Sequence, residues 1–215
     1  MEDLLVQVAK RVQTKYFGKY RGFVVDNADP MHIGRLKLKV PSVLGTTELD
    51  WALPCLPFGG LADHGLFSVP EPDAQVWVEF EEGELSQPIW TGTFWQKADE
   101  SPAEAQLDPP TTRVFKTPAG HLLQFDDEAD KEKVLLHHVS GAELSIDEKG
   151  IVVLTDAAGS TITLDADAEE VVVAEASGNT LSMTSSGITV EDANGNKIEM
   201  ASGGIKVVAD KIELG

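Results

Sequence analysis

The sequence has little cysteine, little positive charge and no long apolar run. Cys55 is the only cysteine in 215 residues, which excludes an intrachain disulfide and fits folding in a reducing compartment. Lys and Arg total 17 against 36 Asp and Glu, and the net charge of −19 repels nucleic-acid phosphates and anionic lipid. No apolar run has the length of a membrane span, and the N-terminus lacks the pattern of a secretory signal.

Hydrophobic residues make up 42% of the chain, enough for folded structure, but their kind changes along it. Aromatic residues almost vanish in the second half, where Phe115 and Phe125 are the last two. Gly, Asp, Thr, Ser and β-branched residues replace them. The changes predict four regions, namely an N-terminal helix at 1–17, a β domain at 18–97, a linker at 98–112 and a second β domain at 113–215.

Four segments of the first β domain alternate or run apolar at strand length. They are YRGFVVD at 20–26, GRLKLKVP at 34–41, QVWVEFEE at 75–82 and IWTGTFW at 89–95. Turn residues separate them at 26–30, 70–73 and 81–84. Strands of this number and spacing, with few helices, predict a small barrel or sandwich.

Apolar residues of the second β domain come in i, i+2 pairs, which mark one face of a strand. The pairs are Leu123/Phe125, Val134/Leu136, Leu144/Ile146, Ile151/Val153, Ile162/Leu164, Val171/Val173, Leu181/Met183, Ile188/Val190, Ile198/Met200, Ile205/Val207 and Ile212/Leu214. We expect one short strand from each pair. Stacked at about 4.8 Å, these strands form a rod on the order of 50 Å long.

Glycines precede these pairs at two fixed distances. Those three residues before a pair are Gly120, Gly141, Gly159, Gly178 and Gly195. Those one residue before a pair are Gly150, Gly187 and Gly204. The segments 178–194 and 195–211 are copies of one 17-residue unit, so each unit predicts two strands with glycine-bearing corners.

Each predicted strand offers only two apolar side chains to a core. Their burial stabilises by about 1.5–3 kcal/mol each, whereas ordering the backbone costs roughly 1–2 kcal/mol per residue. A single-chain β-solenoid is one solution, and several identical chains around a shared axis are another, three being the smallest number that encloses an axis. The expected trimer core is Ile151, Val153, Ile162, Leu164, Val171, Val173, Leu181, Met183, Ile188, Val190, Ile198, Met200, Ile205 and Val207.

Residues 20–95 contain an ordered set of motifs: a G-x-V strand, a D-P turn, a G-R strand, Trp51, a G-x-F-x-x-P turn, a V-x-V-x-F strand and a P-x-x-x-G strand. This order resembles the OB-fold domain of the phage baseplate assembly protein V family. That family comprises the central spikes of contractile phage tails and their relatives in type VI secretion and extracellular contractile injection systems.

The resemblance implies an all-β chain with an N-terminal OB-fold barrel and an intertwined trimeric β-helix. It implies a non-enzymatic homotrimer, made in the cytoplasm and assembled into a phage tail or injection particle. A baseplate hub above the barrel, a separate conical tip protein and a transiently pierced target membrane are the implied partners. Which of the three kinds of system contains the chain stays open.

The chain departs from the family pattern at two places. The family commonly has Gly in the turn before the V-x-V strand, where this chain has PEPDA at 70–74. Some members carry a lysozyme domain between barrel and rod, where this chain has only the linker. The first departure concerns the local turn, and the second leaves the expected function mechanical.

Candidate metal ligands are few, and we expect no cofactor or metal. Adjacent strand residues point to opposite faces, so His137 and His138 cannot share a metal within one chain, although three copies of one of them could meet on an axis. A surface pair or a corner is the simpler interpretation. Asp126, Asp127, Glu128 and Asp130 are interpreted as a solvated acidic loop, and no calcium-loop motif occurs.

The sequence ends directly after the last apolar pair. Such a trimer end exposes open strand edges, and the resemblance implies a separate cap of the proline-alanine-alanine-arginine repeat type. We expect the cap to dock on Lys211, Ile212, Glu213, Leu214 and Gly215.

Two other functions are open at this point. A polysaccharide-degrading β-solenoid needs a groove with aromatics and paired carboxylates, and the second half is poor in aromatics. An OB-fold nucleic-acid binder could stack bases on its tryptophans, but the net charge opposes it. The pair Gly34 and Arg35 is expected to be structural rather than catalytic.

Overall fold

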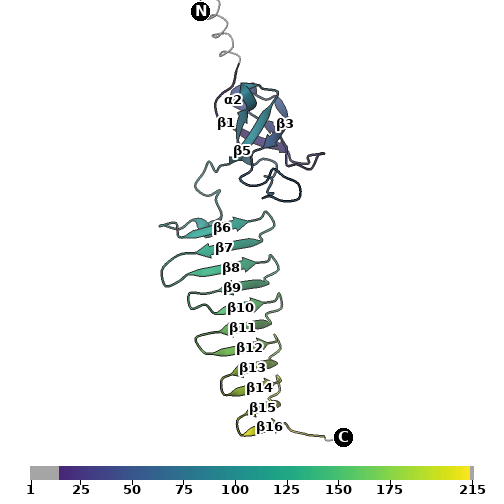
Figure 1. Cartoon of the computed structure of the whole chain (residues 1–215), viewed down its shortest axis with the longest axis vertical. Coiled ribbons are helices and arrows are strands. Elements are labelled where there is room, and N and C mark those ends of the chain that lie inside the picture. The colour runs from purple at the N-terminus through teal and green to yellow at the C-terminus, as the bar shows by residue number, and fades with distance from the viewer. Residues whose placement is uncertain (1–14, 214–215) are drawn as a thin grey trace, which may run out of the picture. The chain divides into compact units, whose positions relative to one another are not determined.

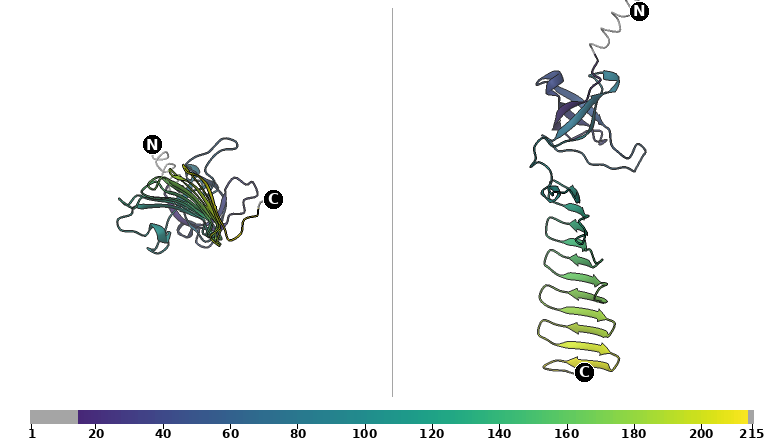
Figure 2. Two further views of the ribbon diagram at one scale, coloured as in Figure 1. Left: turned by 90° about the horizontal axis from the view of Figure 1, so that it is seen from below. Right: turned by 90° about the vertical axis from the view of Figure 1, so that its left-hand side faces the viewer.

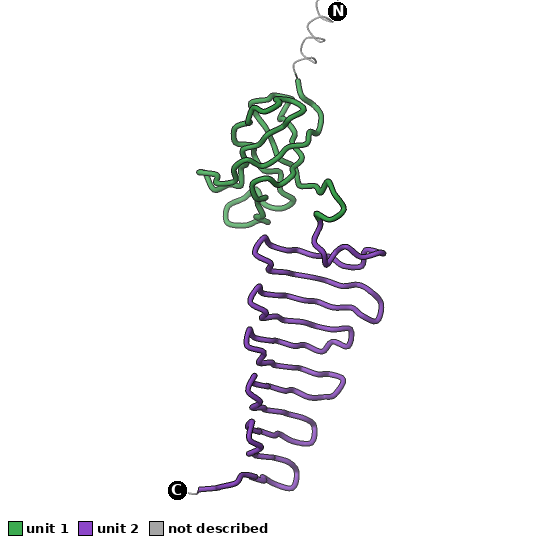
Figure 3. Tube along the Cα trace, turned by 180° about the vertical axis from the view of Figure 1, so that it is seen from behind, with its two compact units in different colours: residues 1–100 green, residues 101–215 purple. Residues whose placement is uncertain are grey.

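The structure is a computed structural model that describes residues 15–213. The chain divides into two compact units, Met1–Glu100 and Ser101–Gly215 (Figure 3). Strands dominate both units, so the expected all-β class is confirmed. No helix within the described residues is long and apolar enough to cross a bilayer.

The first unit is a closed five-stranded barrel in which the strand order is β1-β2-β3-β5-β4 (Figure 1). β1 closes the barrel by pairing with both β2 and β4, and β3 runs parallel to β5. This is the OB topology that the motifs predict. The elements are β1 (Tyr20–Asp26), β2 (Leu36–Lys39), α2 (Pro41–Leu44), β3 (Glu48–Pro54), β4 (Gln75–Phe80), η1 (Glu81–Gly83) and β5 (Pro88–Thr93).

Alternating residues of these strands fill the barrel. In β2 and β4 every second residue is buried, which is the period of two that a half-buried strand requires. Trp90 of β5 closes the interior. The core consists of Val24, Leu36, Leu38, Val40, Leu49, Ala52, Val76, Val78, Phe80 and Trp90.

The predicted N-terminal helix meets the described residues only at its end. Residues 1–14 lie outside them, and 15–17 are not helical. The Tyr16 amide donates instead to the Gly83 carbonyl at 2.9 Å, and the Tyr16 ring packs against Phe80. The last residues of the expected helix therefore belong to the barrel.

The turn before β4 keeps its shape without the family's glycine. Asp73 adopts φ 69°, a left-handed conformation that Asp tolerates better than most side chains. The Asp73 amide donates to the Val24 carbonyl at 2.9 Å, and the Val24 amide donates to the Ala74 carbonyl at 3.0 Å. Asp73 thus supplies the positive φ for which glycine is the usual residue.

The second unit is an antiparallel sheet of eleven strands in which each strand pairs with its neighbours in sequence (Figures 1 and 2). Every strand has four or five residues. The strands are β6 (Thr112–Lys116), β7 (Leu122–Asp126), β8 (Lys133–His137), β9 (Glu143–Ile146), β10 (Val152–Thr155), β11 (Thr161–Asp165), β12 (Glu170–Ala174), β13 (Thr180–Thr184), β14 (Gly187–Glu191), β15 (Lys197–Ala201) and β16 (Gly204–Val208).

Part of the predicted linker packs on this sheet. The short helix η2 (Ala103–Ala105) lies against β6, and Glu104 forms an ion pair of 2.6 Å with Lys116. Thr112 and Leu122, on the face that this segment covers, are the only buried residues described in the second unit.

The two glycine spacings correspond to the two edges of the sheet. Glycines three residues before a pair lie in the hairpins β6–β7, β8–β9, β10–β11, β12–β13 and β14–β15, all at one edge, with φ from 85° to 107°. Glycines one residue before a pair lie at the other edge. There a Cβ on Gly187 would stand 2.1 Å from the Met200 carbonyl oxygen, so only glycine fits.

Candidate trimerisation surface

The strand register places the apolar side chains of the sheet in two columns on one face. Residues directly opposite each other in an antiparallel pair point to the same side. One column is Phe115, Leu123, Leu136, Leu144, Leu154, Ile162, Val173, Leu181, Val190, Ile198 and Val207. The other is Phe125, Val134, Ile146, Val152, Leu164, Val171, Met183, Ile188, Met200 and Ile205.

These columns are open to solvent in a single chain. None of their members is buried, and the large side chains classed as exposed range from 36% for Met183 to 71% for Ile205. Contiguous exposed apolar surface of this extent marks an interaction site in a soluble protein. The face is therefore a candidate interaction surface over its whole length.

The expected pair on β10 is wrong by one residue. Val153 lies opposite Ser145 and Thr163, so it points to the other face, and Ile151 precedes the strand. Val152 and Leu154 continue the columns instead. The run Ile151–Leu154 is apolar at every position, so its sequence contains two i, i+2 pairs and no period to choose between them.

Two further differences concern the ends of the sheet. Ile212 lies in no strand, and Leu214, the other member of that pair, lies outside the described residues. Strand β6 was not predicted, because only Phe115 of its residues enters the apolar columns, while Arg113 stands opposite Phe125. The other expected core residues lie on the predicted common face.

The opposite face becomes more polar toward the C-terminus. Its central column begins with Val114, Gln124 and Leu135 and ends with Ser182, Thr189, Glu199 and Lys206. Glu199 forms ion pairs with Lys197 at 2.6 Å and with Lys206 at 3.5 Å. Lys197 lowers the pKa of Glu199, and Glu199 raises that of Lys197. Toward the C-terminus, this face therefore presents polar and charged side chains to solvent.

Carboxylates organise several hairpins at the edge of the sheet that carries the turns β6–β7, β8–β9, β10–β11, β12–β13 and β14–β15. Oδ1 of Asp156 accepts from the amides of Ala158 and Ser160, and Oδ1 of Asp192 accepts from those of Asn194 and Asn196. Backbone donors lower the pKa of Asp156, whereas the Asn196 side chain is the main cause for Asp192. Hydrogen bonds that favour the ionised form hold these turns closed.

The residues interpreted as an acidic loop form local contacts. Asp126 accepts from the Thr112 hydroxyl at 2.6 Å, and Asp127 pairs with Arg113 at 2.5 Å. Glu128 forms an ion pair with Lys131. These contacts give the carboxylates a role in the β6–β8 segment.

The two adjacent histidines occupy a strand end and a corner. His137 ends β8, with Nδ1 3.4 Å from a Glu143 oxygen, and His138 begins the next turn, where its amide donates to the Ala142 carbonyl at 2.8 Å. The rings of His138 and His121 have centroids 4.5 Å apart. Within residues 15–213 no three potential ligands gather as a metal site.

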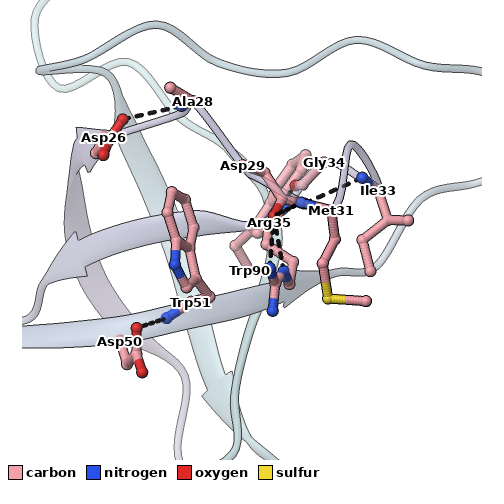
Figure 4. A network of polar contacts seen from close by, with 10 residues as sticks. All are labelled: Asp26, Ala28, Asp29, Met31, Ile33, Gly34, Arg35, Asp50, Trp51 and Trp90. Carbon is pink, nitrogen blue, oxygen red and sulfur yellow. Dashed lines mark hydrogen bonds and ion pairs between the residues drawn. The ribbon is translucent and has the colours of Figure 1, made fainter.

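In the barrel, the D-P and G-R motifs form one polar network around Asp29 (Figure 4). Asp29 is 5% exposed and accepts from the amides of Met31, Ile33 and Arg35. Its Oδ1 also accepts from Arg35 Nε at 2.9 Å and Nη2 at 2.6 Å. The Arg35 side chain, with these amides, holds the pKa of Asp29 far below its usual range.

Arg35 and Gly34 also meet the barrel tryptophans. The Arg35 guanidinium lies 5.5 Å from the Trp51 ring centroid, and Trp90 Nε1 donates to the Gly34 carbonyl at 2.9 Å (Figure 4). The ion-pair partner of Arg35 is Asp29 of the same chain. The G-R motif is therefore structural, as expected.

The C-terminal segment carries the expected docking residues only in part. Lys211, Ile212 and Glu213 follow β16 without forming a strand, and Leu214 and Gly215 lie outside the described residues. Lys211 pairs with Glu213, and the Ile212 side chain is 55% exposed. β16 itself is the last strand of the sheet, and no strand within residues 15–213 pairs with its outer side.

The chain combines a closed OB barrel with a sheet that leaves one apolar face uncovered. Residues 20–95 match the type VI secretion system/phage-baseplate injector OB domain, and residues 112–171 match the phage baseplate V C-terminal trimerisation domain. The chain belongs to the phage baseplate V family. These matches support a structural role in a phage baseplate or spike, and the second supports a homotrimer. A search of curated proteins found no match.

Proposed function

We propose that three copies of this chain form the central spike of a contractile injection system, with the apolar columns of their sheets packed around one axis. The observation that carries the proposal is the pair of apolar columns that runs from β7 to β16, which one chain leaves in water. The matched trimerisation domain covers β6 to the start of β12, and the same columns continue to β16.

In this assembly each chain contributes one side of a three-sided rod. Hydrogen-bonded strand pairs connect β6 to β16 within one chain, so neighbouring chains need only supply the apolar core. Seen along the stack, successive strands rotate relative to one another, as the intrinsic twist of a sheet requires (Figure 2). Three twisted sheets that share a core wind around each other, which gives the intertwined β-helix.

The function of such a rod is mechanical. Separating one chain exposes its whole apolar face at once, so unfolding has a high barrier and the rod has high kinetic stability. The barrel docks to the baseplate hub, and the rod pierces the target envelope when the tail contracts. The chain carries no catalytic step in this proposal.

The mass of the purified full chain in solution tests this proposal. We expect a mass near three times 23.1 kDa by light scattering, unchanged on dilution and in mild detergent. A folded species of 23.1 kDa at working concentration contradicts it.

A separate tip protein is proposed to cap the C-terminal end. The unpaired side of β16 and the exposed Ile212 side chain support this placement. The full chain should retain a candidate tip protein in a pull-down, and a chain that ends at Asp210 should not. Equal retention by both chains contradicts docking on residues 211–215.

The enzyme and nucleic-acid alternatives have weaker support. Apart from Phe115 and Phe125, the apolar face of the sheet is lined by non-aromatic side chains, and the barrel's exposed aromatics belong to a chain with a net charge of −19. Turnover of envelope polysaccharides, or salt-dependent DNA binding at physiological ionic strength, would each favour its alternative over the spike.

A further inference from the structure

One rim of the barrel gathers the chain exit and two long loops. β3 and β5 are parallel, so both end at the same rim, and the chain leaves the barrel there after Thr93. β4 is antiparallel to β5, and β1 to β4, so β1 ends at this rim as well. The loops at 27–35 and 55–74 therefore lie at the rim from which the chain continues toward its trimerisation domain, and we call it the exit rim.

The exit rim carries large apolar side chains in water. Within 55–68, which we call the rim loop, the exposed ones are Phe58, Leu61, Leu66 and Phe67, and Leu61 reaches 78% exposure. Met31 and Ile33 of the neighbouring loop are exposed too. Asp63 is the only acidic residue of the rim loop in a chain that has 36.

A backbone hydrogen bond and two close contacts hold the rim loop in one conformation. The Leu66 amide donates to the Phe58 carbonyl at 3.0 Å, which closes the loop at its base. At Gly65, φ is 149° and a Cβ would stand 3.1 Å from the Phe58 carbonyl oxygen, so the two sides approach closely. The Phe67 ring lies beside Gly34, where a Cβ would be 3.2 Å from it. The loop is thus held against the G-R motif.

In a homotrimer, the barrels of the other two chains are available to cover this surface. The two compact units adjoin at Glu100 and Ser101, so trimerisation of the second unit confines three barrels to a small volume. Tethering raises their effective concentration to the millimolar range, where a modest apolar contact forms. Like charges repel elsewhere on these acidic barrels, and the rim loop is nearly free of them.

We propose that the rim loop of each barrel packs against the rim loops of the other two chains, as a second subunit contact besides the sheet columns. The inference rests on the homotrimer of the proposed function. The baseplate hub fits this surface less well. The proposed hub lies on the side of the barrel away from the chain exit, so it would contact the opposite rim, which carries the segment 15–19 and the connections at 40–47 and 81–87. The contact holds the barrels together where the chains enter the rod.

Cysteine cross-linking of the full chain tests the contact. In a Cys55→Ser background, Leu61→Cys places a single thiol on the rim loop, and Thr46→Cys places the matched thiol at the opposite rim. Both positions are exposed, so the chain tolerates both changes. We expect a short bismaleimide to join Leu61→Cys subunits at least tenfold faster than Thr46→Cys subunits, with Phe58→Cys behaving like Leu61→Cys.

Light scattering of the same samples separates the contact from the trimer. A mass of three chains with no faster cross-linking at 58 and 61 than at 46 overturns the contact and leaves the spike proposal standing. A thiol at 61 that resists maleimide and does not cross-link also overturns it, because another surface then covers the loop. A mass of one chain in the parent Cys55→Ser protein overturns both proposals.

Discussion

The barrel and the sheet of this chain solve the same folding problem in different ways. The barrel curls five strands around ten buried side chains, so one chain encloses its own core. The sheet has eleven strands, and only two of its described residues are buried, both under the adjoining linker. The number of strands does not by itself produce a core. The barrel encloses a core because its strands close on themselves, whereas the sheet stays open.

The difference shows where the free energy of association comes from. Fixing the backbone costs about 1–2 kcal/mol per residue in either unit, but only the barrel offsets that cost by burial within one chain. In the sheet the matching burial is deferred to the partners, so folding and assembly are linked. We therefore expect changes on the sheet to leave the barrel folded, and changes in the barrel to leave the assembly of the sheet intact.

The largest expected effect is a charge placed in the columns. In the proposed trimer, Val190→Asp puts three carboxylates near the shared axis, where burial without partners costs several kcal/mol. The neighbouring Thr189→Asp puts the same charge on the opposite face. Light scattering should show loss of the trimer for the first variant only, with the barrel still folded by tryptophan fluorescence. Equal behaviour of the two variants would remove the distinction between the faces.

The register of β10 gives the next effect. Leu154→Asp should disrupt the trimer as Val190→Asp does, whereas Val153→Asp should leave the mass of three chains unchanged. Val153 points away from the columns, beside Ser145 and Thr163. If Val153→Asp dissociates the trimer and Leu154→Asp does not, the pair chosen from sequence is correct and the register is shifted.

A change at Asp29 should act on the barrel alone. Asp29→Ala leaves three backbone amides and the Arg35 side chain without their acceptor, which we expect to lower the barrel melting temperature by roughly 5–10 °C. Asp26→Ala removes one bond to Ala28 and serves as the control, with a shift of a degree or two. Scanning calorimetry measures both, and the mass should stay that of the trimer.

The smallest effect concerns acid. The pKa values of Asp156 and Asp192 are lowered in the folded chain, so they stabilise above the ordinary value of 3.8, and this contribution fades as the pH falls below it. Asp29, held further down by Arg35, should stay ionised over the same range. Between pH 7 and 3 the sheet should lose a few degrees of melting temperature relative to the barrel.

The double variant Asp156→Ala, Asp192→Ala is the control for this interpretation. It lacks both turn carboxylates, so its sheet should melt lower at pH 7 and change less on acidification. An unchanged pH dependence would assign the acid response to other groups.

The sequence predicted most of the sheet because its pattern is local. A period of two and a glycine at a fixed distance report on strand and turn within a few residues, and the two glycine classes proved to be the two edges. The β10 pair failed where the run Ile151–Leu154 has no period. Strand β3 was missed because its buried residues, Leu49 and Ala52, are three residues apart, so an irregularity in its pairing with β2 interrupts the period of two.

The candidate surface divides in the same way. Twelve of the fourteen expected core residues share the predicted face, since neighbouring strands of equal length repeat one register. The pairing of Arg35 with Asp29 could not be predicted, although they are six residues apart, because it depends on how the 27–35 loop folds over the barrel end. The exposed rim loop had no periodic signal at all.

For this protein, the amino-acid order alone determined that the second half is made of short strands with one apolar face, because both properties depend on spacing along a single strand. The three-dimensional arrangement decided which residues of β10 join that face, which carboxylate Arg35 meets and which rim of the barrel bears the apolar loop. Each of these depends on which strands lie beside each other and in which direction they run.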